Sequence, residues 1–388
     1  MGLVLLCIVG HASATINIGD KAYDHTWHTK NNMPEVRSDM TATTVGNAIY
    51  IIGGCWIDQT WVHDPVYSEY KCGAGLEVAI TKKAFKYLPG DDRYETLPDA
   101  PRGRYRHAAA VVGQKIYVVG GVDWQGNAVS QVDVLDTQAG TWSTFAFNMP
   151  TPTADPAAFA FGGKVYVVGG YVLPNYDASK VTYVLNPAGA SGSAWYQGPQ
   201  MIEGRGDTFA TIVAGKAYVL GGFTHVNQFK TPLASLEELD VSRTGATWVP
   251  KRDIPTARGD KAVAGLNDVL HVVGGETKND AGHSVPLRDV EVYDPSSNLW
   301  YTGGNIPSKR FRFTAAAHGN SIYIFGGQGF LEGTYGTTGS KYPLLSTVEQ
   351  YKEEVSLVAA GAHALAPSAG VCALLMAILS TAAAFVAM

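Results

Sequence analysis

Arginine and aspartate recur along this chain in three-residue elements that keep a fixed distance from a Gly-Gly pair. The first position of each element lies sixteen residues before the first glycine, and five of the six elements have arginine there: Arg37, Arg104, Arg205, Arg258 and Arg310. The third position lies fourteen residues before that glycine and is occupied by Asp39, Arg106, Asp155, Asp207, Asp260 and Arg312. Guanidinium and carboxylate groups at one register favour charge-assisted hydrogen bonds, either within the protein or to a charged ligand.

Two of these elements, at residues 205–207 and 258–260, read Arg-Gly-Asp, the letters of a cell-adhesion signal. The other four read "RSD", "RYR", "TAD" and "RFR". A specific adhesion triplet would not permit a variable middle residue. We therefore interpret both triplets as members of the repeated element and not as an adhesion motif.

The elements that must position these charges are repeated β-sheets. Each Gly-Gly closes a segment of one shape: "NAIYIIGG", "QKIYVVGG", "GKVYVVGG", "GKAYVLGG", "DVLHVVGG" and "NSIYIFGG". An alternating strand, a turn and an aromatic residue follow: Tyr94, Trp142, Trp195, Trp248 or Trp300. Short apolar runs bounded by turn residues predict strands, four to each unit, which we call a to d. Six such sheets bury both of their apolar faces when they pack around an axis.

The Gly-Gly pair, the tyrosine before it and the later tryptophan resemble kelch repeats over residues 22–352. The resemblance implies an all-β fold, a six-bladed kelch-type β-propeller. In kelch ligand-binding proteins, arginines of the d-to-a connection contact acidic peptides. By register, the resemblance carries that role to Arg106 and Arg312.

The spacing also predicts how the ring closes. Trp27 precedes Arg37 by the same ten residues that separate Trp195 from Arg205, which places Trp27 on a d strand. At the other end, "STVEQYKE" (346–353) is a c strand with no d strand after it. We expect the N-terminal strand to complete the last blade and to remove an exposed sheet edge.

One face of the propeller is predicted to carry the function. The a-to-b turns are tight, whereas the b-to-c connections are long at 55–76, 276–287 and 328–345 and share their face with the d-to-a elements. Arg106 and Arg312 flank Asp39 in the circle, and Arg102 and Lys309 lie nearby in sequence. This predicts an electropositive arc for a carboxylate, an acidic peptide or an acidic sugar. The alternative is that the charged ring ties the blades together.

The loop from Cys55 to Cys72 departs from the repeat and contains Trp56, Trp61, Tyr67 and Tyr70. Two cysteines close in sequence suggest one disulfide in an oxidising compartment. Rigid, partly exposed aromatic side chains favour protein interfaces and sugar stacking. The alternative is that they pack back on the blade.

Both ends of the chain resemble sorting signals. Residues 1–14 have an apolar core and an Ala-x-Ala site, as in a secretory signal peptide. After a linker at 353–368, residues 369–388 form an uncharged hydrophobic tail. Ala359 is a candidate glycolipid (GPI) attachment residue before that tail, and a retained transmembrane helix is the alternative. The net charge of −5, with no basic run, argues against nucleic acid as a partner.

The sequence has neither a nucleophile elbow nor a phosphate-binding loop, and we expect no cofactor and no metal. The first hypothesis is a secreted or cell-surface binding module for an extracellular protein or acidic glycan. The alternative is a secreted sugar-modifying enzyme, such as a sialic acid epimerase-like kelch protein, with Glu203 near Arg205 as its only acid/base candidate. An intracellular scaffold with reduced cysteines is a third reading.

Overall fold

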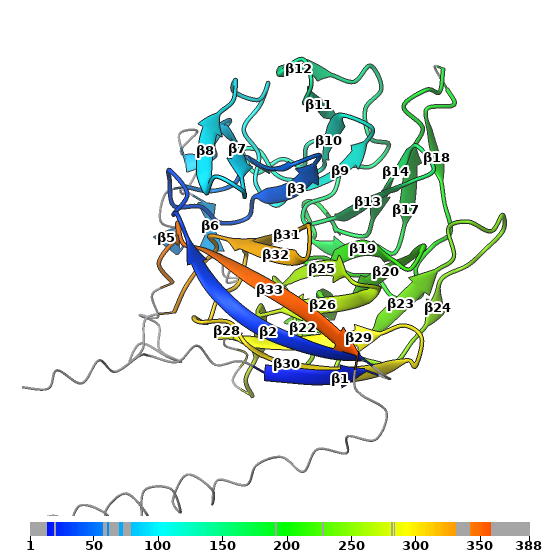
Figure 1. Ribbon diagram of the computed structural model, residues 1–388. Coiled ribbons are helices and arrows are strands. Elements are labelled where there is room, and N and C mark those ends of the chain that lie inside the picture. Colours follow the sequence, from blue (N-terminus) through cyan, green and yellow to red (C-terminus); the bar gives the residue numbers. More distant parts are fainter. Residues whose placement is uncertain are drawn as a thin grey trace, which may run out of the picture.

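The computed structural model describes residues 14–18, 21–56, 60–61, 70–72, 79–190, 192–226, 229–280, 282, 284–330 and 342–357. Six antiparallel sheets stand around a common axis in this part of the chain (Figure 1). The all-β propeller predicted from the repeats is therefore confirmed. A search of the described residues finds no helix with the length and apolar character needed to cross a membrane. Residues 1–13, Ala359 and the tail at 369–388 lie outside the described residues.

In each of the first three blades, the strands pair in the order a, b, c, d. Blade 1 consists of β3 (Thr41–Val45), β4 (Ala48–Ile52), β7 (Ala84–Leu88) and β8 (Arg93–Thr96). Blade 2 consists of β9 (Ala108–Val112), β10 (Lys115–Val119), β11 (Asp133–Asp136) and β12 (Thr141–Thr144). Blade 3 consists of β13 (Ala157–Phe161), β14 (Lys164–Val168), β17 (Thr182–Leu185) and β18 (Trp195–Gln197).

The last three blades repeat this order, and the sixth uses both ends of the described chain. Blade 4 consists of β19 (Phe209–Val213), β20 (Lys216–Leu220), β23 (Leu236–Leu239) and β24 (Val249–Pro250). Blade 5 consists of β25 (Ala262–Leu266), β26 (Val269–Val273), β29 (Asp289–Asp294) and β30 (Leu299–Asn305). Blade 6 consists of β31 (Thr314–His318), β32 (Ser321–Phe325), β33 (Val348–Leu357), β2 (Lys21–Lys30) and β1 (Ala14–Ile18).

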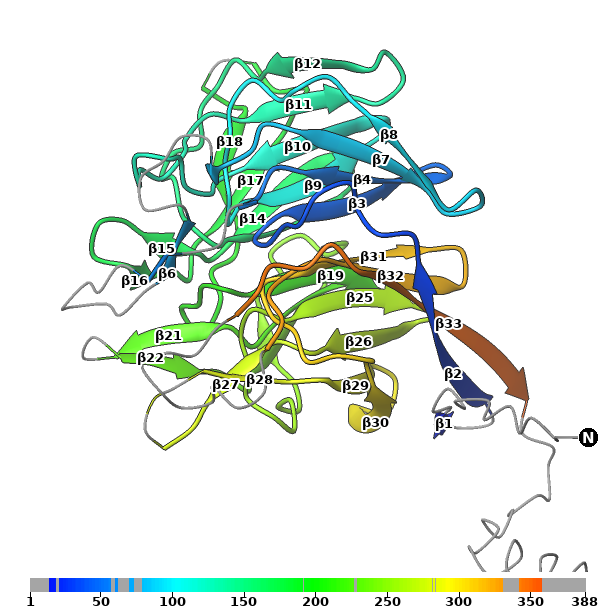
Figure 2. The same cartoon turned by 90° about the vertical axis from the view of Figure 1, so that its left-hand side faces the viewer.

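The ring closes through the pairing of β2 with β33, as the spacing of Trp27 predicts (Figures 1 and 2). Trp27 lies opposite Tyr351, and their ring centroids are 5.2 Å apart. β1 adds a fifth strand outside β2, so this blade extends past the predicted limits of 22 and 352. Ala14, the last residue of the predicted signal peptide, is the first residue of β1.

The two faces of the propeller differ in the way that the strand directions predict. Short hairpins interrupt four b-to-c connections: β5 (Thr60–Trp61) with β6 (Tyr70–Lys71), β15 (Tyr171–Val172) with β16 (Asp177–Ala178), β21 (Phe223–Val226) with β22 (Phe229–Pro232), and β27 (Glu276–Lys278) with β28 (Ser284–Pro286). They gather at one side of the molecule, on the left in Figure 2. We call this side the loop-rich face.

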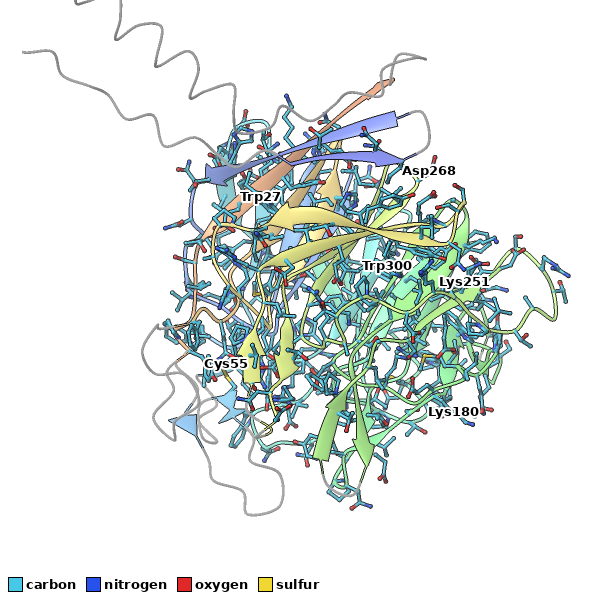
Figure 3. The ribbon with its side chains drawn as sticks, turned by 90° about the horizontal axis from the view of Figure 1, so that it is seen from below. Trp27, Cys55, Lys180, Lys251, Asp268 and Trp300 are labelled. Atoms are coloured by element: carbon cyan, nitrogen blue, oxygen red, sulfur yellow. A yellow bond between two sulfur atoms is a disulfide. The ribbon has the colours of Figure 1, made fainter. Side chains whose placement is uncertain are left out.

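Tryptophans of the outer strands link neighbouring blades. Trp142, Trp195 and Trp300 each donate an indole N–H to a carbonyl that follows the outer strand of the preceding blade, at 2.8–3.1 Å. Figure 3 shows Trp300 on β30 of blade 5 and Trp27 on β2 of blade 6. The tryptophan of the repeat therefore fastens the rim of the ring, while apolar residues of adjacent sheets pack between the blades.

Candidate functional site

The five arginines at the first position of the repeated element are buried, and their side chains brace their own blades. Each guanidinium donates to the carbonyl of the first glycine of its own Gly-Gly pair, at 2.9–3.3 Å. Each also forms an ion pair with an acidic side chain, at 2.6–3.1 Å. The partner of Arg37 is Glu35, two residues earlier, and the other four partners lie on the c strand of the same blade. At most 2% of any of these residues, Arg37, Arg104, Arg205, Arg258 and Arg310, is exposed.

The backbone of this position explains the Gly-Gly pair. The carbonyl of Arg104 accepts a hydrogen bond from the N–H of Gly54 in the preceding blade, at 2.9 Å. The same bond recurs at every blade junction, including the junction where Thr153 replaces arginine. A Cβ at Gly53 would lie 2.7 Å from the Arg104 carbonyl, and both glycines have positive φ. These five arginines therefore follow the structural reading, because a ligand has no exposed surface to contact.

The third positions form a ring around the mouth of the channel. All six residues have a left-handed φ between 48° and 55°: Asp39, Arg106, Asp155, Asp207, Asp260 and Arg312. Five of the six carry a backbone N–H that donates to the carbonyl of the preceding ring residue, for example Arg106 to Asp39 at 3.0 Å and Asp155 to Arg106 at 2.9 Å. We call these six residues the channel ring.

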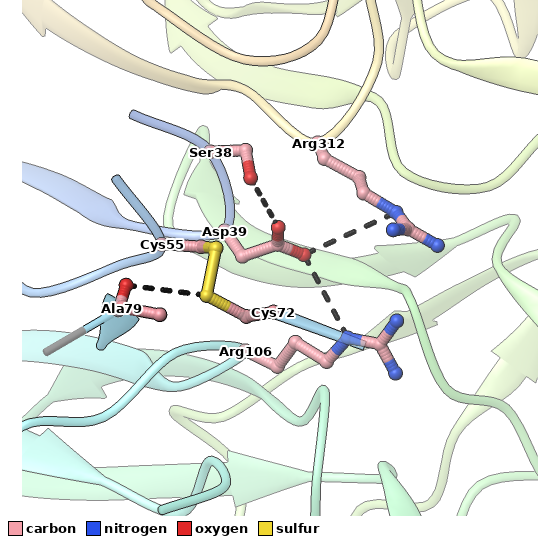
Figure 4. Close-up of a disulfide and its surroundings, with 7 residues drawn as sticks. All are labelled: Ser38, Asp39, Cys55, Cys72, Ala79, Arg106 and Arg312. Atoms are coloured by element: carbon pink, nitrogen blue, oxygen red, sulfur yellow. Dashed lines mark hydrogen bonds and ion pairs between the residues drawn. A yellow bond between two sulfur atoms is a disulfide. The ribbon is translucent and has the colours of Figure 1, made fainter. Parts of the chain in front are cut away.

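The electropositive arc predicted from Arg106 and Arg312 is not found, because acidic neighbours compensate both arginines. Arg106 lies 3.7 Å from Asp39 and 3.5 Å from Asp155. Arg312 lies 4.0 Å from Asp39 and 3.3 Å from Asp260. Figure 4 shows Asp39 between the two guanidinium groups. With four carboxyl groups and two guanidinium groups, the channel ring has an excess of acidic side chains.

That excess is concentrated in blades 3, 4 and 5. Burial and the neighbouring Asp207 carboxylate raise the pKa of Asp260 well above 3.8, against the opposing charge of Arg312. The hydroxyl of Tyr171 donates to Asp207 at 2.9 Å. Two adjacent carboxyl groups, one of which favours its protonated form, therefore lie on one side of the channel ring.

A cavity of about 230 Å³ lies beside the channel ring and extends along the innermost strands. Its wall includes all six ring residues together with Thr41, Thr43, His107 and Thr211. Burial lowers the pKa of His107 to about 3, so its imidazole is neutral near pH 7. Across the described ranges, no cluster of three or more metal-ligating side chains is found.

Glu203, the acid/base candidate predicted from the sequence, lies away from this cavity. Its carboxylate accepts a hydrogen bond from Ser235 at 2.5 Å and lies 3.8 Å from the Arg205 guanidinium. It is not among the residues that line the cavity. The carboxyl groups that the cavity does contain come from the channel ring.

The structure pairs Cys55 with Cys72, whose Cα atoms are 5.8 Å apart (Figure 4). The backbone of Cys55 is bonded in both directions to that of Ser38, so this loop is anchored beside Asp39 of the channel ring. Trp56 follows directly and is 39% exposed. The Lys83 ammonium lies 6.0 Å from its ring centre. The side chain of Trp61 and all of Tyr67 lie outside the described residues.

A second hollow, of about 440 Å³, lies on the loop-rich face between blades 1 and 2. We call it the Trp124 groove, since Trp124 is 41% exposed at its edge. Trp124 was not predicted as a site residue, because it lies outside the loop from Cys55 to Cys72 that departs from the repeat. The signal was present in "DWQGN" (123–127), a tight-turn sequence with tryptophan at its tip.

Comparisons with known proteins agree with the repeat pattern. Residues 106–327 match the family model described as the KLHDC2/KLHL20/DRC7 Kelch-repeats domain. The chain is 25% identical over 227 residues to Kelch repeat protein M-T8 of Myxoma virus, covering 58% of this chain and 42% of that protein. It is 27% identical over 263 residues to Kelch-like protein terF of Aspergillus terreus, covering 62% and 54%. The matches thus span about half the length of these relatives.

A likeness to a solved structure extends over nearly the whole fold. The structure titled "Structure of YjhT" superimposes with a TM-score of 0.63 and 17% identity. The match covers 84% of this chain and 99% of that one. At this identity, the likeness supports the propeller architecture alone.

Proposed function

This chain belongs to the kelch-repeat family, and we propose that it is a binding module that holds a protein or glycan ligand on its loop-rich face. One observation carries the proposal: long connections, two hollows and two exposed tryptophans share that face, whereas the a-to-b turns opposite are tight. Concave surfaces with a few polar groups and exposed aromatic rings are typical of recognition sites.

The binding experiment compares two surfaces of the same protein. Purified protein is applied to glycan and extracellular-protein arrays, together with W56A and Y196A variants. Tyr196 is 42% exposed on β18, outside the loop-rich connections. We expect a ligand whose signal falls with W56A and is unchanged with Y196A. Equal loss with both variants, or no ligand on either array, contradicts the proposal.

We further propose that the protein is exported and held at the cell surface, through a lipid at Ala359 or through the tail at 369–388. The sequence pattern of both ends and the pairing of Cys55 with Cys72 support this proposal. Treating expressing cells with phosphatidylinositol-specific phospholipase C should release a lipid-anchored protein into the medium. Retention on the cell surface instead favours a transmembrane tail, and a cytosolic protein with reduced Cys55 contradicts export.

A second candidate function, an enzyme acting on an acidic sugar, is favoured by the carboxyl pair at the channel ring. Asp260 is suited to donate a proton, because burial and the neighbouring Asp207 carboxylate raise its pKa. The test is NMR exchange between the anomers and epimers of N-acetylneuraminic acid with wild-type protein and D260N. Acceleration that is lost in D260N and retained in E203Q supports an enzyme; no acceleration by the wild type rejects it.

A further inference from the structure

The Trp124 groove combines an exposed aromatic ring with cationic and amide side chains. Its wall includes Lys82, Arg102, Asp123, Asn127 and Gln131. The volume of about 440 Å³ falls in the range of small-ligand sites. The groove lies toward the outer edge of the loop-rich face. Its walls come from the d-to-a connection and the b-to-c loop of blade 2 and from Lys82 of blade 1. It shares no lining residue with the central cavity.

The backbone at Trp124 is fixed by a turn whose hydrogen bonds do not involve the tryptophan side chain. One carboxylate oxygen of Asp123 accepts hydrogen bonds from the N–H groups of Gln125 and Asn127, each at 2.9 Å. The backbone N–H of Asp123 donates to the Asn127 carbonyl at 3.0 Å. Because this backbone is already ordered and an indole has few rotatable bonds, little conformational freedom is lost when a ligand binds, which favours Trp124 as an anchor.

The charge of the groove wall favours an anion. Arg102 and Arg104 both bind the carboxylate of Asp133, which is 1% exposed. One carboxylate between two guanidinium groups leaves one positive charge, and the exposed Lys82 adds a second. Asp123 subtracts one, so the wall has a net charge of +1. Arg102 is 29% exposed, and Asp133 occupies only part of its five N–H donors.

The polar side chains between these charged groups are suitable hydrogen-bond partners for the hydroxyl groups of a ligand. Asn127, Ser130 and Gln131 bring amide and hydroxyl side chains to the same hollow. A pyranose ring presents C–H groups on one face, which pack on an indole, and hydroxyl groups around its edge. A carboxylate on that sugar is the group that Arg102 and Lys82 bind best.

We propose that the Trp124 groove is a glycan subsite that takes a sugar bearing a carboxylate, with Trp124 stacking on the ring and Arg102 with Lys82 binding the acid. The proposal rests on the binding function proposed above and names the class of ligand. An acidic peptide would satisfy the two cations. A sugar also uses the exposed indole for stacking and the side chains of Asn127, Ser130 and Gln131 as hydrogen-bond partners for its hydroxyl groups, whereas an acidic peptide requires neither.

The test uses sialyllactose and a glucuronate-terminated disaccharide, with lactose as the neutral probe. Affinity is measured by isothermal titration calorimetry on the full chain, and ring contact by saturation-transfer NMR. We expect both acidic sugars to bind at least tenfold more tightly than lactose, with a preference that weakens as salt is added. W124A should reduce acidic-sugar affinity tenfold or more, and K82A/R102Q should remove the preference for the acid.

Y196A is the matched control, since it removes an aromatic side chain of equal exposure on another blade. Thermal unfolding of W124A and Y196A should match the wild type, because Trp124 and Tyr196 are both exposed. The subsite is overturned if lactose binds as tightly as the acidic sugars, or if neither acidic sugar binds. It is also overturned if the W124A protein binds the acidic sugars as tightly as the wild type. Competition by an acidic peptide without sugar binding also overturns it. An array ligand that is insensitive to W124A rejects the subsite and leaves the binding module intact.

Discussion

The aromatic ring of Tyr171 in blade 3 lies against the α-carbon of Gly206 in blade 4. A Cβ at position 206 would be 2.3 Å from a carbon of that ring. One blade later, Phe223 lies against Gly259 in the same way, and a Cβ there would be 2.1 Å from its ring. These glycines are the middle residues of the two Arg-Gly-Asp triplets, so the triplets arise from packing between blades. Their arginine and aspartate side chains are buried as well.

The junction between blades 1 and 2 shows the reverse distribution of side-chain sizes. Each middle residue forms a backbone bridge with the residue that follows the Gly-Gly pair of its own blade. Across the junction from blade 1 to blade 2, the residue after the Gly-Gly pair is the small Cys55 and the middle residue is the large Tyr105, and both lie in one buried cluster. The interpretation that the middle position is free is therefore wrong for these two glycines, since the preceding blade restricts their size.

Replacing Gly206 with alanine should destabilise the protein by roughly 1–3 kcal/mol, because the new methyl group overpacks against Tyr171. Chemical denaturation measures this change in the free energy of unfolding. Gly90 is exposed with open space around it, so G90A is the control and should be nearly neutral. In a Y171A background, the additional cost of G206A should fall; an unchanged cost would falsify the steric explanation.

Removing the tryptophan that closes the ring should lower stability strongly. Trp27 is 6% exposed and packs on Tyr351, so W27A should cost roughly 3–5 kcal/mol. W124A removes the same side chain from an exposed site and should change the melting temperature little. Similar melting temperatures for the two variants would contradict the closure by β2.

Arg310 tests the structural role of the buried arginines. Its guanidinium binds the carboxylate of Glu349 at 2.8 Å and the carbonyl of Gly326 at 3.3 Å. R310M leaves Glu349 buried without its charge partner and should cost roughly 3–5 kcal/mol in urea unfolding. R310M/E349Q removes both charges and should recover part of that loss. A double variant as unstable as R310M would show that the ion pair is not the main contribution of Arg310.

Lys261 should make stability depend on pH. Its side chain is fully buried, and its ammonium has no hydrogen-bond partner within the described part of the chain. Burial, together with the charge of Arg205, lowers its pKa from 10.5 to about 7, against the attraction of Asp260 and Asp207. The unfolded chain keeps this proton up to pH 10.5, whereas the folded chain releases it near 7. Folding therefore releases a proton between these values, and stability should rise with pH across that window.

K261M removes the titrating group and should flatten this rise. It should also raise stability at pH 6–7, where the cost of burying the charge is largest. Each unit of pKa depression corresponds to about 1.4 kcal/mol, so the effect amounts to a few kcal/mol. Melting temperatures measured from pH 6 to pH 10 give the two curves. Parallel curves for the wild type and K261M would show that Lys261 is not the group responsible.

The repeat register predicted the six blades, the closing strand and the identity of the loop-rich face, because each depends on periodicity and strand direction. The charge of the channel ring could not be predicted in this way. Asp39, Arg106 and Arg312 are recognisable in the sequence, but only the fold shows that Asp39 lies between both guanidinium groups. Likewise, Arg205 and Asp207 are only two residues apart in the sequence. The Arg205 side chain pairs with Glu237 on a strand of its own blade, whereas Asp207 lines the cavity.

The pairing of β2 with β33 also has a consequence for biosynthesis. Residues 21–30 leave the ribosome more than three hundred residues before their hydrogen-bonding partner at 348–357 is translated. Throughout that interval, β2 is an unsatisfied ribbon whose backbone donors and acceptors can pair with any passing strand. Synthesis of residues 348–357 is therefore the step that allows β2 to pair and removes this exposed edge from the nascent chain.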